Sequence, residues 1–139
     1  MTDTKAERPR FRFNFFKLNV ADLQASAAFY RDAFGFEERG RIDLPDVEEV
    51  MLAMPGEAFT LVLLRYKDGR AHQLGDAWGP LGFLTRDIDA AVAHALAHGA
   101  TPVRGPLATD FSRYAFVADP EGHQIELIQF DRPAPATGA

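Results

Sequence analysis

The residue with the clearest potential for chemistry is Glu126, which lies in an apolar segment near the end of the chain. Ile125 and Leu127 flank it, and successive side chains of a strand point to opposite faces, so Glu126 points away from both. A carboxylate in that position can serve as a general base or can anchor a donor group of a ligand. The alternative is a solvated or ion-paired carboxylate without a chemical role.

Few other side chains have the types and spacing that chemistry requires. The chain contains no cysteine, which excludes disulfides, thiolate metal sites and cysteine nucleophiles. His94 and His98 have a helical spacing that can bind metal, but no Glu follows His94 as in a zinc-protease motif. We therefore expect both on the exposed side of a helix. His123 follows a turn, and we expect it to be a turn residue rather than a ligand.

An internal repeat positions these groups. The segment Asp22–Ala28 recurs as Asp87–Ala93, about 65 positions later. Each copy follows an apolar run and begins with an Asp suited to cap a helix, and each helical pattern stops at a glycine, Gly35 or Gly99. A repeat of this length indicates two similar supersecondary units.

Strand patterns complete both units. Each helix is preceded by one apolar strand pattern and followed by three, the third strand of the second unit being the weakest signal. The sequence thus predicts an α+β fold in which tandem βαβββ modules form a half-barrel with a cavity on its concave side. We place the modules at residues 11–67 and 80–131, a linker at 68–79, and disordered tails at 1–10 and 132–139.

Composition narrows the classes of partner. The 139 residues suffice for one domain with a hydrophobic core, and the net charge of −5 argues against nucleic acid as a partner. No apolar run approaches the ~20 residues of a membrane span, and the first residues lack the apolar stretch of a signal peptide. We expect a cytoplasmic protein that binds neither nucleic acid nor membrane.

The sequence resembles the vicinal oxygen chelate superfamily, which includes glyoxalase I, extradiol dioxygenases and the bleomycin-resistance proteins. The resemblance is carried by the tandem modules, by the helix entry Val20–Leu23, by Phe29 and Tyr30, by Gly35–Phe36, and by the run Asp119–Leu127. It extends over residues 13–130, nearly the whole ordered chain.

The resemblance implies four cavity positions that hold a divalent metal in the enzymes of this family, where His, Glu or Gln occupy them. In this chain these positions fall on Phe15, Val62, Pro80 and Glu126. Only Glu126 offers a side-chain donor, whereas a transition metal needs about three protein ligands. We therefore expect no metal at these positions and no cofactor.

The predicted function is binding of a small, aromatic or apolar organic molecule in the cavity, as in bleomycin-resistance-like relatives. One alternative is a metal-independent isomerase, cyclase or lyase with Glu126 as its catalytic general base, and another is a metalloenzyme with relocated ligands. Glyoxalase I is disfavoured because Asn19 stands where the family has a basic residue, and extradiol dioxygenase activity is disfavoured too. Resemblance also predicts a homodimer.

The predicted ligand-binding residues are Phe15, Lys17, Asn19, Val62, Tyr66, Trp78, Pro80, Arg113, Tyr114 and Gln124. Lys17 is expected to pair with Glu126 or to contact an anionic ligand.

Overall fold

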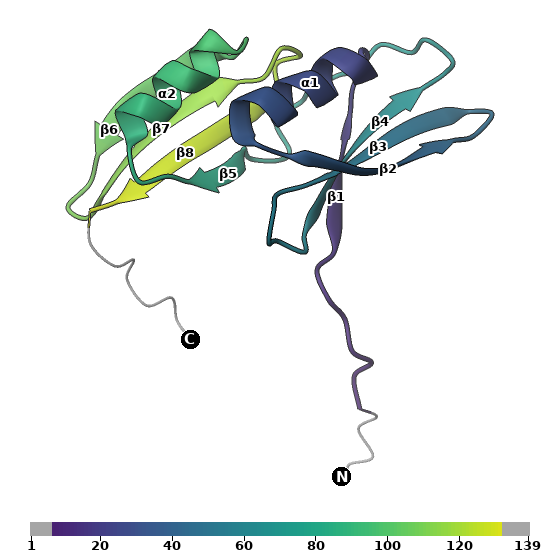
Figure 1. Ribbon diagram of the computed structural model, residues 1–139, viewed down its shortest axis with the longest axis horizontal. Helices are drawn as coiled ribbons and strands as arrows, with labels where there is room; N and C mark the ends of the chain where they lie inside the picture. The colour runs from purple at the N-terminus through teal and green to yellow at the C-terminus, as the bar shows by residue number, and fades with distance from the viewer. Residues whose placement is uncertain (1–6, 132–139) are drawn as a thin grey trace.

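The computed structural model describes residues 7–131 and contains two modules, each a four-stranded sheet with one helix (Figure 1). The first module comprises β1 (Phe15–Asn19), α1 (Leu23–Phe34), β2 (Glu37–Asp43), β3 (Val47–Ala53) and β4 (Thr60–Tyr66). The second comprises β5 (Leu81–Leu84), α2 (Ile88–Ala97), β6 (Thr101–Ala108), β7 (Ser112–Ala118) and β8 (Gln124–Phe130). The α+β class and the tandem βαβββ order are confirmed.

The two sheets have the same topology. Their strand orders are β1-β4-β3-β2 and β5-β8-β7-β6, and the first strand of each module runs parallel to the last strand of that module. The other neighbouring strands are antiparallel hairpins. β1 and β5 are therefore both edge strands, and the two sheets are hydrogen-bonded separately.

The repeated Asp residues start the two helices. The Asp22 carboxylate accepts a hydrogen bond from the amide of Ala25, and the Asp87 carboxylate accepts one from Ala90. Such N-caps contribute about 1 kcal/mol each to helix stability. Gly35 ends α1 with a φ of 82°, a left-handed conformation that favours glycine. α2 ends two residues before Gly99, with His98 as its C-cap.

Two strands depart from a regular pattern. β1 begins at Phe15, four residues after the start of the predicted first module at residue 11, and β6 runs to Ala108 through register shifts on both sides of Arg104. Irregular pairing of this kind breaks the alternation on which sequence patterns depend. The predicted tails at 1–6 and 132–139 lie outside the described residues, and residues 7–10 belong to no helix or strand. No helix within residues 7–131 is long and apolar enough to cross a membrane.

One hydrophobic core joins the modules on the side of the sheets that carries the helices. It includes Leu18, Leu61 and Leu63 from the first sheet and Ile125 and Leu127 from the second. We call this side of each sheet the helix face and the opposite side the far face. The two helices lie side by side above the sheets (Figure 1). Phe34 of α1 stacks on Phe83 of β5 with ring centroids 4.3 Å apart, which continues the core across the boundary.

The turn between β7 and β8 fastens the second module to α1. The Glu121 carboxylate accepts hydrogen bonds from the amides of Ala21 and Asp22, at 2.7 and 2.8 Å. It thus neutralises the amide-rich start of α1, where negative charge is favourable. The fully buried Tyr30 donates its hydroxyl hydrogen to Asp119 Oδ2 at 2.7 Å.

Asp119 is the centre of a buried polar cluster at this junction. Its carboxylate also accepts hydrogen bonds from the amides of Glu121 and His123 and lies 3.0 Å from Nδ1 of the His123 ring. Burial, together with the negative charge and hydrogen bond of Asp119, raises the pKa of Tyr30 far above its ordinary value. Burial opposes ionisation of Asp119, but the hydrogen bonds from His123 and Tyr30 outweigh it and lower the pKa of this carboxyl. The hydrogen bond to Asp119 raises the pKa of His123.

Tyr30→Phe should lower the free energy of unfolding by about 1–3 kcal/mol, because it removes one hydrogen bond to a buried carboxylate. Urea denaturation of the purified protein measures this loss. Tyr114→Phe is the matched control, since it removes the same hydroxyl from a half-buried ring that packs on Phe116. Equal stability losses in both variants would contradict the assigned role of Tyr30.

The pH dependence of stability should show the Asp119–His123 pair. The raised pKa of His123 stabilises the fold, and this contribution is complete at pH values below the pKa of His123 in the unfolded chain, about 6.5. The contribution is lost as the pH rises through the pKa of His123 in the folded protein. The lowered pKa of Asp119 stabilises the fold at pH values above the pKa of Asp119 in the unfolded chain, about 3.9. This contribution is lost as the pH falls through the pKa of Asp119 in the folded protein. The free energy of unfolding of the parent protein should therefore exceed that of His123→Gln most at about pH 5–6, and the difference should decline at lower and higher pH.

Thermal melts across that pH range measure this difference. His98→Gln is the control, because His98 is exposed on α2 and its ring bonds only the backbone of its own helix. A constant difference between the parent protein and His123→Gln at all pH values would rule out the linkage.

Candidate functional site

The four positions that correspond to the family's metal ligands lie on the far faces of the two sheets. Lys17 is the cross-strand neighbour of Val62, and Phe15 precedes Lys17 by two residues on the same face. In the second sheet Gly82 is the neighbour of Glu126, and Pro80 takes the corresponding place two residues earlier. Phe15 and Val62 in the first sheet thus occupy the same places as Pro80 and Glu126 in the second sheet. This equivalence supports the assignment of the four positions from the internal repeat.

These four residues do not fit a divalent metal. Phe15 and Val62 have no donor atoms, Pro80 offers only its carbonyl, and Glu126 is a single carboxylate. Within residues 7–131 no group of three or more His, Asp or Glu side chains could hold a metal ion. His94 and His98 are exposed on α2 as expected, and their rings contact each other and the backbone of Asp32 and His94.

The surroundings of Glu126 differ from those expected. Ile125 and Leu127 are buried in the core, so the predicted alternation along β8 is confirmed. The cross-strand neighbours of Glu126 are Gly82 and Phe116, whereas Phe15 and Val62 belong to the other sheet. The prediction that Lys17 pairs with Glu126 is wrong, because the Lys17 ammonium lies 2.7 Å from Oε2 of Glu49.

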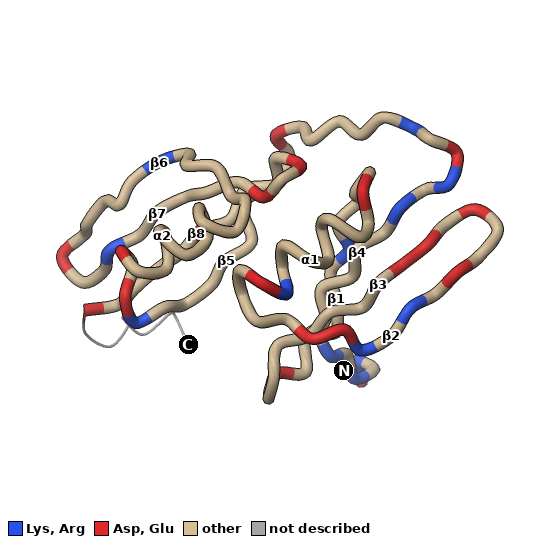
Figure 2. The backbone as a smooth tube through the Cα atoms, turned by 45° about the horizontal axis from the view of Figure 1, so that its top comes forward, with Lys and Arg blue, Asp and Glu red and all other residues tan. Residues whose placement is uncertain are grey.

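Glu49 is a charged residue that the sequence analysis missed. Its side chain, on β3, is only 9% exposed, while the side chain of Lys17 is 39% exposed. The tube in Figure 2 shows that acidic segments gather along the β2–β3 hairpin, and Glu48 and Glu49 form one of them. Alternation along β3 puts Glu48 on the helix face, where it pairs with Arg65, and Glu49 on the far face, where it pairs with Lys17. No local pattern marked Glu49 as the more buried of the two.

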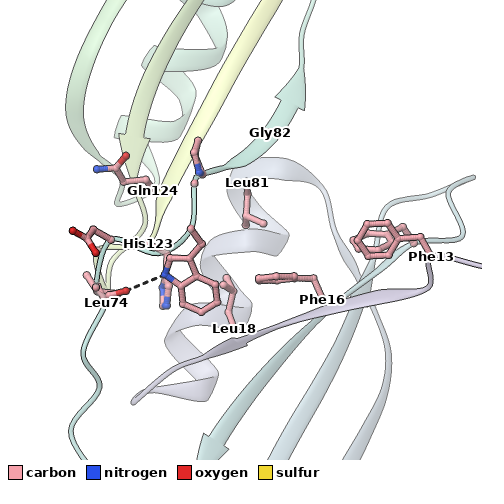
Figure 3. Close-up of a pocket in the computed structure, with 15 residues that line it drawn as sticks. Phe13, Phe16, Leu18, Leu74, Leu81, Gly82, His123 and Gln124 are labelled. Carbon is pink, nitrogen blue, oxygen red and sulfur yellow. Dashed lines mark hydrogen bonds between the residues drawn. The ribbon is translucent and has the colours of Figure 1, made fainter. Parts of the chain in front are cut away.

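An apolar pocket of about 730 Å³ lies between the modules. Its walls come from β1, the linker, the start of β5 and the β7–β8 turn, through Phe16, Leu18, Trp78, Leu81 and His123 among others (Figure 3). The indole Nε1 of Trp78 donates a hydrogen bond to the carbonyl of Leu74 at 2.9 Å, and its ring lies 5.8 Å from that of Phe16. Trp78 thus forms part of the wall while 54% of it stays exposed.

The predicted ligand-binding residues fall into two groups. Trp78, Pro80 and Gln124 line the pocket, together with His123, which the sequence analysis had taken for a turn residue without another role. The others lie elsewhere on the molecule, and a ligand-binding role for them stays a prediction: Phe15, Lys17, Asn19, Val62, Tyr66, Arg113 and Tyr114.

Three residues of that second group have contacts of their own. The Arg70 guanidinium carbon lies 3.7 Å from the centre of the Tyr66 ring, an arrangement typical of a cation–π contact. Arg113 pairs with Asp89 at the start of α2, on the helix face. Tyr114 therefore takes the far face of β7, as alternation requires.

Comparison with known proteins identifies the family. A model described as the Glyoxalase/Bleomycin resistance protein/Dioxygenase superfamily matches residues 12–127. A lactoylglutathione lyase from Neisseria meningitidis is 31% identical over 119 residues, which cover 81% of this chain and 86% of that protein. A glyoxalase family protein from Bacillus cereus has the same fold, with a TM-score of 0.77 at 19% identity over 91% of this chain and 99% of its own.

A longer relative also matches. Lactoylglutathione lyase from Arabidopsis thaliana is 31% identical over 124 residues, which make up 85% of this chain. The matched region is 44% of the plant protein, so the chain spans less than half the length of this relative.

These relatives correct the predicted function. The sequence analysis favoured a bleomycin-resistance-like binder and disfavoured glyoxalase I, but the curated relatives are named lactoylglutathione lyase. The prediction gave decisive weight to the metal positions and Asn19, whereas the similarity extends over nearly the whole described chain. On that similarity, the chain belongs to the glyoxalase/bleomycin-resistance/dioxygenase superfamily.

Proposed function

We propose that this chain is a lyase that acts on lactoylglutathione or a closely similar thioester. The observation that carries the proposal is the 31% identity to the Neisseria meningitidis lactoylglutathione lyase along 86% of that protein. Agreement along most of both chains favours a shared type of activity over a shared fold alone.

The pocket between the modules is the proposed place of the substrate. Its volume of about 730 Å³ lies within the range of ordinary ligand sites, roughly 300–1,000 Å³. Aromatic and aliphatic walls suit the carbon skeleton of a thioester, and the amide of Gln124 supplies a polar group at the rim. No step is assigned to a metal, because three of the four family positions lack side-chain donors.

As a lyase, the purified chain should interconvert lactoylglutathione with glutathione and 2-oxopropanal, by breaking or forming the C–S bond without water. The gain of ultraviolet thioester absorbance from glutathione and 2-oxopropanal measures this reaction and distinguishes it from thioester hydrolysis. The assay is run alone and with added divalent cations. Trp78→Ala should lower kcat/KM at least about tenfold, because it removes a large part of the pocket wall and an aromatic contact to the substrate worth roughly 1.4 kcal/mol or more. Leu44→Ala, at an exposed position of the β2–β3 turn, should leave kcat/KM unchanged. Absence of turnover under every condition would overturn the proposal.

We also propose that the chain forms a homodimer, in the cytoplasm as composition favours. Two features support it: β1 and β5 are unpaired sheet edges, and Phe11, Phe13 and Phe15 are 81%, 84% and 50% exposed. Large apolar side chains grouped beside an open edge favour association, since the contact removes both from water. Sedimentation equilibrium should give twice the mass of the chain, and Phe13→Glu with Phe15→Glu should shift the mass toward that of one chain. A monomer at all concentrations would contradict this.

A further inference from the structure

The far face of the first sheet contains an ion pair in an unusual setting. Lys17 of the edge strand β1 reaches across β4 to Glu49 of β3, with Nζ 2.7 Å from Oε2. The residues between them on β4 are the buried Val62 and Leu64, which are the cross-strand neighbours of Lys17 and Glu49. A carboxylate is thus held in an apolar surface and neutralised by one ammonium group.

Such a pair is a poor device for stability alone. Withdrawing a carboxylate from water costs free energy that a single ion pair barely recovers, and apolar residues of similar size usually serve a sheet at least as well. The pair does fix the position of the ammonium group, because the nearly buried Glu49 has little freedom to move. The result is an ammonium group at a defined place beside the apolar side chains of Phe15 and Val62.

The ammonium group has hydrogen-bonding capacity to spare. A lysine ammonium has three donors, and Glu49 accepts one of them. Among the described residues no second hydrogen-bond acceptor of Lys17 Nζ is found, and 39% of the side chain is exposed. The Phe15 ring lies 5.6 Å from Nζ, and the half-exposed ring gives a flat apolar surface beside it.

The Lys17 ammonium group lies near two of the positions that the resemblance assigns to a metal. Phe15 precedes Lys17 by two residues on the same face of β1, and Val62 is the cross-strand neighbour of Lys17 on β4. We propose that the Lys17–Glu49 pair is a second binding site, on the face of β1 opposite to the pocket walls Phe16 and Leu18, for the anionic oxygen of an organic ligand, with Lys17 as donor and Glu49 as positioning residue. A fixed hydrogen-bond donor toward an anionic oxygen stabilises its charge without a metal. The ligand class is a small organic acid with an apolar body that lies on Phe15.

The site is independent of the proposed lyase function, and a binding experiment without turnover tests it. The probe is phenylglyoxylate, a carboxylate with an aromatic body, and its methyl ester is the neutral counterpart. Isothermal titration calorimetry should show that the carboxylate binds more tightly than the ester. The double variant Lys17→Gln, Glu49→Gln removes the ammonium without stranding a buried carboxylate, and it should weaken phenylglyoxylate binding about tenfold while leaving the ester unchanged.

The matched control is Lys67→Gln with Asp43→Asn, which neutralises an exposed lysine–carboxylate pair between β2 and the end of β4. This control should bind phenylglyoxylate like the parent protein, and circular dichroism melts should confirm that both double variants fold. Lys17→Arg should retain most of the affinity. Equal affinity of the parent and the Lys17–Glu49 double variant, or an equal loss in the control, would overturn the site.

The two proposals fail separately. Binding of phenylglyoxylate that depends on Lys17, in a protein that does not turn over lactoylglutathione, would keep the site and overturn the lyase. Turnover of lactoylglutathione by a protein whose phenylglyoxylate binding does not depend on Lys17 would keep the lyase and overturn the site.

Discussion

The arrangement of the two modules depends on the turn between β7 and β8. Its carboxylates bind module one at two points, Glu121 at the start of α1 and Asp119 at the hydroxyl of Tyr30. Both contacts involve charged oxygens, which accept stronger hydrogen bonds than neutral ones, and the Tyr30–Asp119 contact is also buried. Because the turn also carries His123 into the wall of the pocket, the same interaction that fastens the modules shapes the space between them.

Two surfaces with different chemistry result from this arrangement. The pocket opens between the modules among aromatic and aliphatic side chains, and its polar side chains are those of Asp76, His123 and Gln124. The far face of the first sheet instead presents a fixed ammonium beside an exposed phenylalanine. We therefore place the thioester in the pocket and a separate organic anion on the far face.

The family's metal positions show how a fold can persist while its chemistry changes. The strands that hold these positions are fixed by the core on the helix face, through Leu18, Leu61, Ile125 and Leu127. Phe15, Val62 and Pro80 replace polar residues on the opposite face without disturbing that core, since alternate residues of a strand pack independently. The donor set is absent, and Lys17 supplies an ammonium group beside two of these positions, Phe15 and Val62.

The sequence by itself determined the α+β class, the repeat and the ends of the helices, because capping Asp residues, terminal glycines and alternating apolar residues are local signals. It also identified the family and placed Glu126 away from the core. Tertiary structure decided the partner of Lys17, since the choice between Glu49 and Glu126 depends on which strands lie side by side. Tertiary structure likewise decided the role of His123 and Asp119, whose partner Tyr30 lies 89 residues from Asp119 in the chain. Contacts over such separations follow from how the modules pack, and no local pattern encodes them.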